Sequence, residues 1–485
     1  MLLGIDLGTS SVKALLLQPD GRVVAEAAAA YSVRSPGEGW AETDPADWWE
    51  AVGGAVHRAA GGRGQVVTAM GLSGQMHGVV LCDGDGTPLR PAILWADRRA
   101  VEELAAYRGL PRALGDRLGN PPAVGMAGPS LLWLKRQEPE AYGRARFALQ
   151  PKDWLRLRLC GVAGGEPSDA SATLLYDLER DGWADDVIEA LEIRRSLLAP
   201  LRESAVPAGE LAAAAAEHLG LPAGLPVACG AADTAAAALG SGLLEPGPML
   251  LTVGTGAQIV APLVRPLRDP SGRTHCYRAA APHRWYAMAA IQNAGLALEW
   301  ARGVLGMSWE AVYAEAFGIA GSQGVTFHPY ISGERTPYFQ PRLRGAWSGL
   351  ASDQTRAHLM RAALEGVAFA LRQGLEALSA LGLEGDPIFL AGGGSVDRRF
   401  ARLLAEVLGR ALTVAAVPSA SARGAALLAG LASGAWGSLP EALSLTPAPA
   451  GTIEPSPERS YEEAYASYVR RAASLAREAG SPTKL

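Results

Sequence analysis

The chain begins with an apolar run that ends at an acidic residue, passes through small residues, and continues as a second apolar run. This pattern predicts a β-hairpin over residues 2–17, with Gly8 and Thr9 in its turn. The same order of apolar and small residues returns at 248–264, around the Gly-Thr-Gly turn of 254–256. Because the two hairpins divide the 485 residues almost equally, we expect a duplicated α/β architecture.

A turn-rich segment at 240–248 separates the two hairpin-led halves. The chain is also longer than the roughly 250–300 residues at which a single hydrophobic core stops growing. We therefore predict one domain over residues 1–243 and a second over residues 244–485.

Helical signals lie between the strands. Thr43 or Asp44 can cap a helix that starts at Pro45, and Ser395 or Asp397 can cap another after a glycine-rich turn. In the last predicted helix, over residues 460–479, tyrosines recur on one face. A stripe with that spacing favours packing against a core over a stacking platform for a ligand.

Composition and charge exclude several classes of protein. Apolar residues make up 49% of the chain, and the net charge of −5 comes without a basic stripe, which argues against nucleic acid as a partner. No apolar stretch approaches the roughly 18 residues of a membrane span, and the N-terminus lacks the basic start of a signal peptide. The four cysteines show no disulfide or zinc spacing, so we expect reduced thiols in the cytoplasm.

Four segments combine glycine with hydroxyl or acidic residues at strand ends. Glycine lets backbone amides approach a phosphate closely, and threonine and serine hydroxyls add donors. Each segment alone is also typical of an ordinary turn. Together, two hairpins could close on a triphosphate while a glycine turn meets a purine; the P-loop and GxGxxG patterns are absent. The segments are 6–13, 230–240, 253–256 and 390–395.

Two aspartates in these segments could carry chemistry. Asp6 ends an apolar strand and could hold Mg²⁺ through water, or could simply cap the turn. Asp233 lies at a strand-to-helix junction, where it could take a proton from a substrate hydroxyl or could cap the helix. Spacing alone leaves both alternatives open.

At this point the motifs resemble those of the FGGY carbohydrate kinases, from about residue 2 to about residue 470. Within that family the chain is most similar to members that act on D-xylulose. Residues 345–366 fit the C-terminal signature of the family throughout. The other matching stretches are GIDLGTSSVK, GWAETDPADWW, GLSGQMHG, RPAILWADRRA, PKDWLRLRLCG, DTAAAALGSG, TVGTGA, HPYISGERTP and LAGGGS.

The resemblance implies a fold of two duplicated actin/hexokinase-like (ribonuclease H-like) domains facing a central cleft, with ATP and Mg²⁺ as cofactors. It implies that Asp233 is the catalytic base, that Asp6 positions phosphate, and that both carboxylates face the metal. The residues implied to hold the nucleotide are Thr9, Ser10, Lys13, Gly254, Thr255, Gly295, Gly392, Gly393 and Gly394.

The sugar wall implied by the resemblance contains a Met-His pair where glycerol kinases carry Arg-Glu. An imidazole can hydrogen-bond a sugar hydroxyl while a thioether packs on the carbon chain; a buried structural histidine is the alternative. The chain departs from the family at Thr234, where Asn is frequent, and at Ser130, where Lys is usual. The implied sugar contacts are Gln75, Met76, His77, Trp95, Asp97 and Thr234.

The activity that the resemblance implies is ATP-dependent phosphorylation of D-xylulose to D-xylulose 5-phosphate. Two alternatives stay open: a kinase for another ketose or polyol, such as D-ribulose or L-xylulose, and an ATPase of the same superfold that uses no sugar. The expected partners are the small sugar and ATP, without nucleic acid or membrane. The sequence does not fix the oligomeric state, and a homodimer is one of the states it allows.

Overall fold

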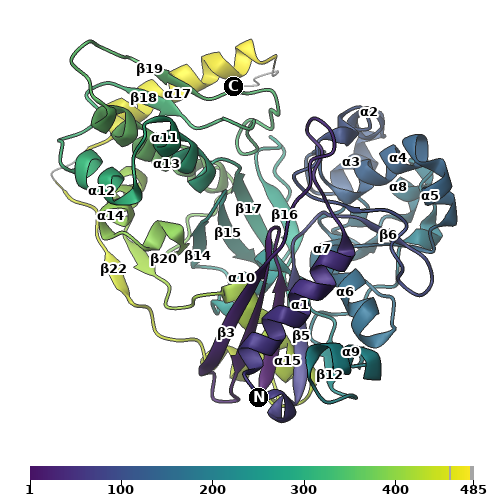
Figure 1. The fold of residues 1–485 in the computed structure, drawn as a ribbon. Helices are drawn as coiled ribbons and strands as arrows, with labels where there is room; N and C mark the ends of the chain where they lie inside the picture. Colours follow the sequence, from purple (N-terminus) through teal and green to yellow (C-terminus); the bar gives the residue numbers. More distant parts are fainter. Residues whose placement is uncertain (458–459, 481–485) are drawn as a thin grey trace.

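A computed structural model describes residues 1–457 and 460–480 (Figure 1). Its framework consists of two seven-stranded sheets, one in each half of the chain. The first sheet contains β1 (Leu2–Leu7), β2 (Ser11–Leu17), β3 (Val23–Ala30), β5 (Ala69–Gly74), β11 (Pro207–Glu210), β12 (Pro226–Ala228) and β13 (Ala231–Ala232). The second contains β14 (Met249–Val253), β15 (Ala257–Leu263), β16 (His275–Arg278), β17 (Trp285–Ile291), β20 (Ile388–Gly392), β21 (Leu412–Val414) and β22 (Gly451–Ile453).

The two sheets share one topology. In the first, β1 pairs antiparallel with β2 and parallel with β5, and β2 pairs with β3. In the second, β14 pairs antiparallel with β15 and parallel with β20, and β15 pairs with β17. The duplicated α/β architecture expected from the two hairpins is thereby confirmed. The second sheet has an additional edge strand, β16, which pairs with β17 and which the periodicity of the sequence did not predict.

Four short two-stranded sheets and the helices complete the fold. The short strands are β4 (Glu42–Thr43), β6 (Val80–Cys82), β7 (Ala92–Ile93), β8 (Phe147–Leu149), β9 (Tyr176–Asp177), β10 (Gly182–Trp183), β18 (Thr326–His328) and β19 (Ala346–Ser348). The helices of the first half are α1 (Pro45–Ala60), α2 (Leu104–Arg108), α3 (Arg112–Arg117), α4 (Ala127–Gln137), α5 (Pro139–Arg144), α6 (Pro151–Cys160), α7 (Pro167–Ala170), α8 (Asp185–Ala190), α9 (Ala213–Leu219) and α10 (Asp233–Gly240). Those of the second half are α11 (Gly295–Val304), α12 (Trp309–Phe317), α13 (Arg356–Ser379), α14 (Arg398–Leu408), α15 (Ala420–Ala432), α16 (Leu439–Ser444) and α17 (Glu462–Glu478).

The predicted helix starts are resolved between their alternatives. Asp44 caps α1 by accepting from the amide of Ala46 at 3.0 Å. Asp397, rather than Ser395, caps α14 through the amides that follow it. The tyrosine stripe of α17 packs inward, because Tyr468 is fully buried against Phe369 of α13.

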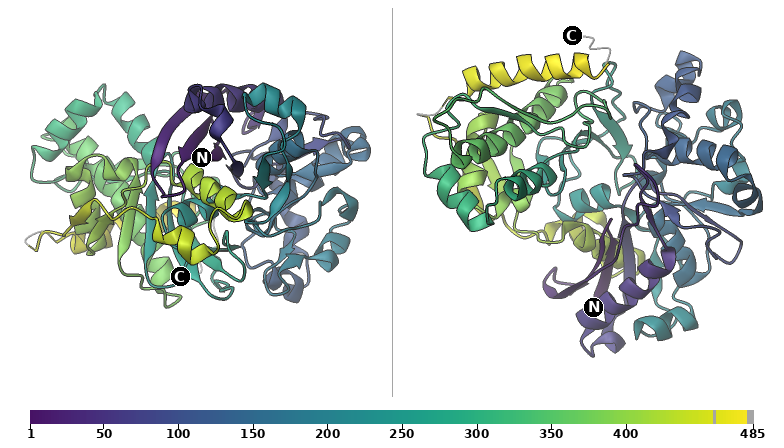
Figure 2. Two further views of the ribbon diagram at one scale, coloured as in Figure 1. Left: turned by 90° about the horizontal axis from the view of Figure 1, so that it is seen from below. Right: turned by 45° about the horizontal axis from the view of Figure 1, so that its top comes forward.

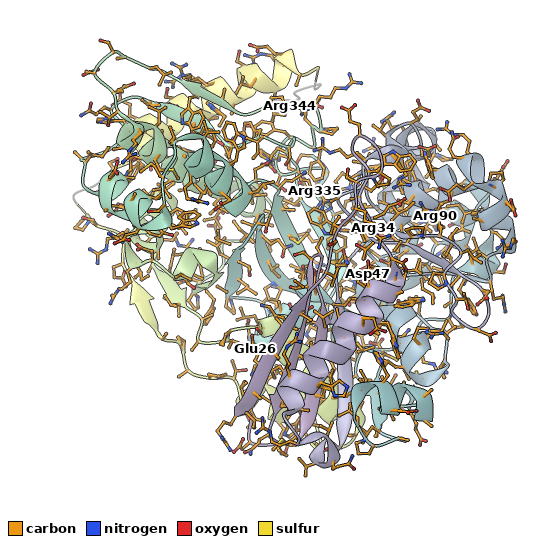
Figure 3. All side chains as sticks on the ribbon, in the orientation of Figure 1. Glu26, Arg34, Asp47, Arg90, Arg335 and Arg344 are labelled. Atoms are coloured by element: carbon orange, nitrogen blue, oxygen red, sulfur yellow. The ribbon has the colours of Figure 1, made fainter. Side chains whose placement is uncertain are left out.

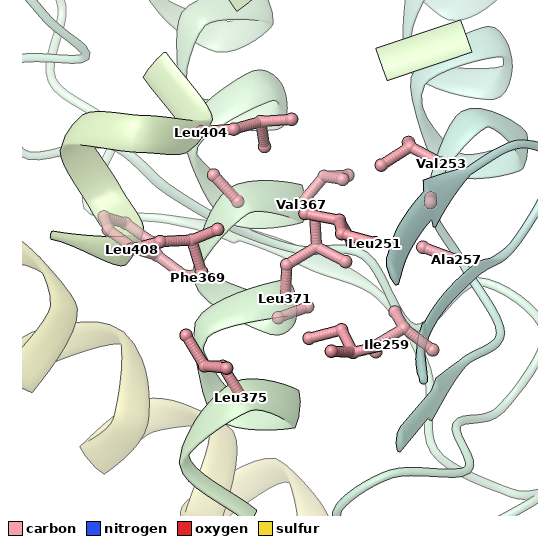
Figure 4. Packing of buried hydrophobic residues seen from close by; sticks show 14 of the residues in the cluster. Leu251, Val253, Ala257, Ile259, Val367, Phe369, Leu371, Leu375, Leu404 and Leu408 are labelled. Carbon is pink, nitrogen blue, oxygen red and sulfur yellow. The ribbon is translucent and has the colours of Figure 1, made fainter. Parts of the chain in front are cut away.

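The core of the second half lies between its sheet and two helices. Leu251 and Ile259 of the sheet face Val367 and Leu371 of α13, and Leu404 of α14 packs on the outer side of α13 (Figure 4). These side chains are at most 1% exposed. A close-packed interior of this kind holds the strand ends of the sheet in fixed positions.

Helix α15 belongs to the second half of the chain but packs on β1 and β5 of the first sheet, as the views in Figure 2 also show. The approach requires glycine, because a Cβ atom on Gly4 or Gly71 would lie 1.9 or 2.0 Å from a carbonyl oxygen of α15. The domain boundary between residues 243 and 244 remains a prediction. Helix α15 comes after this boundary in the chain but packs on the sheet of the first half. Within residues 1–457 and 460–480, no helix combines the length and apolarity needed to cross a membrane.

Candidate active site

The carboxyl ends of the parallel strands β1 and β5 form the edge at which the first polar cluster lies. Asp6 on β1 is the register partner of Ser73 on β5 and of Lys13 on β2. The Ser73 hydroxyl donates a hydrogen bond to Asp6 Oδ1 at 3.1 Å. Burial raises the pKa of Asp6, and the bond from Ser73 and the charge of Lys13 act against that rise. The strand register therefore brings an acidic and a basic group together at one edge.

Asp233 lies at the same edge, since it follows β13, whose Ala232 is the register partner of Gly74 on β5. It begins α10, and its Oδ1 accepts from the Thr234 amide at 2.6 Å and the Thr234 hydroxyl at 3.1 Å. Burial, and then the charge of Asp6, raises the pKa of Asp233 to about 7. A carboxylate with a pKa near the working pH is suited to general-base chemistry.

A buried charge network supports the residue before Asp233. The amide of Ala232 donates to Ser168 Oγ at 2.9 Å, and Ser168 Oγ donates to Glu166 Oε1 at 2.6 Å. Glu166 in turn pairs with Lys152 at 3.3 Å, with both side chains fully buried. Because each member of this network has a partner, it restrains the backbone that presents the carboxylate of Asp233.

The first hairpin turn is tied to the wall beside it. The Trp95 indole Nε1 donates to Thr9 Oγ1 at 2.8 Å, and Gln75 Nε2 donates to the Gly8 carbonyl at 3.2 Å. Ser10 is exposed at the tip of the turn. Lys13 Nζ donates to Ser419 Oγ at 3.4 Å, so this bond ties the lysine to the segment that precedes α15. The predicted phosphate residues of this hairpin and the predicted sugar residues are thus direct neighbours.

The second hairpin turn packs against the start of α11. The amide of Gly295 donates to the Gly254 carbonyl at 2.9 Å, and the amide of Leu296 donates to the Thr255 carbonyl at 2.9 Å. A Cβ atom on Gly295 would lie 2.5 Å from the Gly254 oxygen, so only glycine allows this approach. These two α11 amides are already paired within the protein, and the phosphate contact of the Gly254 turn stays a prediction.

The predicted adenosine glycines lie beside the second hairpin. Gly392 is the register partner of Val253 on β14 and has a φ of 76°, in the region that favours glycine. Gly393 is exposed, and Gly394 packs where a Cβ would come within 2.9 Å of the Val253 side chain. All three predicted glycines therefore lie at the strand end next to the Gly254 turn.

A cavity of about 250 Å³ lies between the second hairpin and Trp95. Its size suits a small polar ligand rather than a macromolecule. The residues that line it are Trp95, Thr252, Gly254, Thr255, Gly256, Ala257, Gln258, Ala290, Ile291, Gln292 and Arg335.

His77 is buried and held in one orientation. Its Nδ1 donates to the Ala172 carbonyl at 2.7 Å, and its backbone has a φ of 71°, which is unusual for a residue other than glycine. Burial, and then the charge of Arg335, lowers the pKa of His77 to about 3, so the ring is neutral. With Nδ1 protonated, Nε2 carries the lone pair and can accept a hydrogen bond from a hydroxyl group. The neighbouring Met76 receives a weak hydrogen bond from Tyr286 at 3.9 Å.

Asp97 is engaged within the protein. Its Oδ2 accepts from the amide of Ala41 at 2.7 Å, and both of its oxygens pair with the Arg99 guanidinium at 2.7–2.9 Å. A carboxylate with these partners supports the wall around Trp95. Its direct contact with sugar stays a prediction.

Two residues that the sequence did not single out join the site. Gln258 Oε1 lies 3.2 Å from the Thr234 hydroxyl, which connects the second hairpin to the residue beside Asp233. Arg335 reaches the cavity from a loop that lies far away in the sequence. The alternation of apolar and polar residues along β15 could have identified Gln258, and the stretch HPYISGERTP contains Arg335. No local sequence pattern, however, predicts that either side chain lies at the site.

Asp6 and Asp233 fit the needs of Mg²⁺. Their carboxylates are close enough for the charge of one to raise the pKa of the other, and a cation between them would relieve that repulsion. Mg²⁺ commonly binds through one or two carboxylates, water and substrate phosphates. No group of three or more His, Cys, Asp or Glu side chains in the described part of the chain is placed to hold a metal, so a cage built from protein alone is not present there. The two aspartates stay predicted ligands.

Two duplicated sheets, a glycine hairpin on each and a buried carboxylate between them define a phosphotransferase of the actin/hexokinase-like class. The chain belongs to the FGGY family of carbohydrate kinases: the N-terminal domain model matches residues 1–240 and the C-terminal domain model matches residues 249–433. The predicted family and fold are confirmed, and the chain is a carbohydrate kinase that acts on a sugar and ATP.

Curated relatives and solved structures support this assignment. A xylulose kinase of Escherichia coli strain K12 is 36% identical over 416 residues, covering 85% of this chain and 86% of the relative. A xylulose kinase of Bacillus subtilis strain 168 is 32% identical, covering 91% and 90%. A crystal structure described as a xyloylose kinase from Brucella ovis superposes with a TM-score of 0.89 at 34% identity, covering 98% of both chains.

Proposed function

We propose that the protein transfers the terminal phosphoryl group of ATP to the terminal hydroxyl of D-xylulose, giving D-xylulose 5-phosphate and ADP. The observation that carries the proposal is the position of Asp233, with a pKa raised to about 7, at the edge shared with Asp6 and next to Thr234, whose hydroxyl lies 3.2 Å from Gln258 of the second sheet. The xylulose kinase relatives support the choice of sugar.

In the proposed mechanism, ionised Asp233 accepts the proton of the sugar hydroxyl. The hydroxyl oxygen forms a bond to the γ-phosphorus as the bond to the bridging oxygen of ADP breaks. Phosphoryl transfer depends mainly on alignment and charge neutralisation, which the amides of the two hairpins and Lys13 can supply. Mg²⁺ held near Asp6 and Asp233 would neutralise phosphate charge when bound.

The sugar would lie along the wall formed by residues 75–77 and Trp95. The neutral His77 ring offers Nε2 as an acceptor, and Met76 offers an apolar surface. Thr234, which stands where the family often has Asn, bonds Asp233 and Gln258. Its hydroxyl therefore supports the base and leaves less polar reach toward the sugar than an amide would.

Ser130, the second departure from the family pattern, bears little on the proposed chemistry. It is buried on α4, and its hydroxyl donates to the Met126 carbonyl of the preceding turn at 3.2 Å. The preference for D-xylulose over D-ribulose, L-xylulose or a polyol therefore depends on the sugar wall.

We also propose a cytoplasmic location, in keeping with four free cysteines. A homodimer stays a prediction, which light scattering on the purified protein can test.

A pH-rate profile of the purified protein with Asp233→Asn as the inactive comparison tests the proposed base. Because the base must be ionised, kcat/KM for D-xylulose should rise with pH along a limb centred near 7 in the free enzyme. The variant should lose at least about 1,000-fold in kcat. Wild-type turnover in the variant would refute the role of Asp233. ATP hydrolysis that no sugar changes would favour the ATPase alternative.

A further inference from the structure

Arg335 carries a positive charge in the middle of the molecule, where Figure 3 places it between the two halves and away from the outer Arg344. Among the residues that the structure describes, no carboxylate lies within 4 Å of its guanidinium. The adjacent Glu334 carboxylate accepts instead from the backbone amides of Gln292 at 2.6 Å and of Arg335 itself at 2.8 Å. The guanidinium is therefore a partly buried cation without an ion-pair partner.

Such a cation is costly unless a ligand meets it, because burial disfavours the charged form. Burial accordingly lowers the pKa of Arg335 below its ordinary value. Other buried guanidinium groups in the described residues have partners: Arg361 bonds Glu365 at 2.7 Å, and Arg423, which has no ion pair, donates to the carbonyl oxygens of Gly240 and Leu445 at 2.7 Å. The described residues give the Arg335 guanidinium neither kind of partner, since the hydrogen bond to Glu334 comes from its backbone amide. The contrast indicates that Arg335 has a partner outside the chain.

The surroundings place Arg335 on the predicted sugar path. Its guanidinium carbon lies 5.5 Å from the centre of the Trp95 ring, and the Trp95 indole is bonded to Thr9 of the first hairpin. Arg335 also lines the 250 Å³ cavity together with Gln258 of the second hairpin. A guanidinium stacked on an aromatic face is held in orientation while its N–H groups stay available.

Two hydrogen bonds connect the base to the cavity that Arg335 lines. Asp233 is bonded to Thr234, Thr234 to Gln258, and Gln258 lines the cavity that Arg335 also lines. A sugar whose terminal hydroxyl lies at Asp233 would extend through the cavity. Its opposite end would then meet the guanidinium.

The region next to Arg335 holds further unsatisfied polar groups. His275 Nε2 and the Tyr277 hydroxyl are both buried without a hydrogen-bond partner in the structure. Burial, and then the charge of Arg335, lowers the pKa of His275 and of His77. Buried polar atoms are nearly always paired in native proteins, so this cluster fits a ligand rich in oxygen.

Building on the proposed function, we propose that Arg335 is a specificity-determining residue that binds the oxygens of the acceptor sugar at the end away from the transferred hydroxyl. A guanidinium has five donors and no acceptor, so it favours an oxygen that only accepts. A ketose presents a carbonyl oxygen there, whereas the corresponding pentitol presents a hydroxyl. Arg335 thus selects ketoses over pentitols.

The test compares Arg335→Gln and Arg335→Lys with Arg344→Gln, a matched change at an exposed arginine whose bonds stay within its own turn. Steady-state kinetics are measured with D-xylulose, with xylitol and with varied ATP. In Arg335→Gln we expect KM for D-xylulose to rise about 10- to 100-fold, from loss of charge-assisted hydrogen bonds. kcat and KM for ATP should change less than about threefold, and the preference for D-xylulose over xylitol should shrink about tenfold.

Arg335→Lys should keep part of the ketose preference, since it keeps the charge but not the fork of donors. Arg344→Gln should match the wild type. A fall in kcat at unchanged sugar KM would overturn the proposal, because the guanidinium would then act on the phosphoryl group. Unchanged kinetics in Arg335→Gln would overturn it too, while wild-type turnover would still uphold the proposed function. A wild-type protein that phosphorylates no ketose would overturn both.

A folding defect is separated from a binding defect by thermal unfolding. Each variant is melted with and without saturating D-xylulose. We expect Arg335→Gln to keep the ligand-free Tm of the wild type and to lose most of the sugar-induced rise in Tm. An undiminished sugar-induced rise would contradict it.

Discussion

Replacing Asp233 by Asn should make the protein more stable at neutral pH while removing its activity. The native structure buries the carboxylate and places Asp6 nearby, which raises the pKa of Asp233 from 3.8 to about 7. At 1.36 kcal/mol for each pKa unit, keeping this group ionised costs the folded state up to about 4 kcal/mol. An asparagine carries no charge, and its Oδ1 can still accept from Thr234.

The sign of the pH dependence follows from linkage. The folded state holds the proton of Asp233 up to about pH 7, whereas the unfolded chain releases it near pH 3.8. Between these values the folded state binds more protons, so this group lowers stability as pH rises and its cost is complete above about pH 7. The advantage of Asp233→Asn should therefore be about 2 kcal/mol at pH 5.5 and about 4 kcal/mol at pH 8.

Calorimetry or dye-monitored melting at both pH values checks this. At ~2.1 cal/mol/K of unfolding entropy per residue, 4 kcal/mol corresponds to a Tm rise of about 4–8 °C, depending on whether the whole chain or one half unfolds as a unit. Asp397→Asn is the matched control at another helix start. Arg399 and helix amides lower the pKa of Asp397, so its loss should reduce stability at pH 8. An Asp233→Asn variant that is no more stable than the wild type at pH 8, or that is stabilised equally at both pH values, would show that the folded state does not raise the pKa of Asp233.

Two further predictions concern packing and positioning. Gly71→Ala would place a Cβ about 2.0 Å from the Ala425 carbonyl of α15 and should lower the free energy of unfolding, measured in urea, by at least about 3 kcal/mol. The control Gly143→Ala has open space around the new Cβ and should not lower it, so equal urea midpoints for the two variants would count against the close approach of α15. Gln258→Leu removes the bond to Thr234 and should lower kcat about 3- to 10-fold with ATP affinity unchanged, and a full-rate variant would show that this bond does not position the base.

Local patterns in the sequence predicted the parts of the fold that depend on neighbouring residues. The two hairpins follow from alternation of apolar and small residues, and the start of α1 follows from Asp44 followed by Pro45. The same patterns located Asp6 and the Gly254 turn at strand ends. The resemblance to the FGGY family then assigned roles to residues that spacing left open.

The parts that could not be predicted depend on contacts far apart in the chain. The packing of α15 on β1 requires the small size of Gly4. The residues next to Gly4 in the sequence indicate only a strand and give no sign of this contact. Arg335 lies 240 positions from Trp95, and only the folded chain stacks one on the other. Likewise, the left-handed backbone of His77 is imposed by its surroundings.

We propose that this carbohydrate kinase phosphorylates a hydroxyl of D-xylulose and that Asp233 is the base that accepts the hydroxyl proton. The most direct measurement is sugar-dependent ADP formation by the purified protein with MgATP, comparing D-xylulose with D-ribulose, L-xylulose, xylitol and glycerol, for the wild type and for Asp233→Asn. We predict the highest kcat/KM on D-xylulose, at least tenfold above each other sugar, and no sugar-dependent turnover in the variant. A higher kcat/KM on another acceptor, or sugar-dependent turnover by Asp233→Asn at the wild-type rate, would contradict the account.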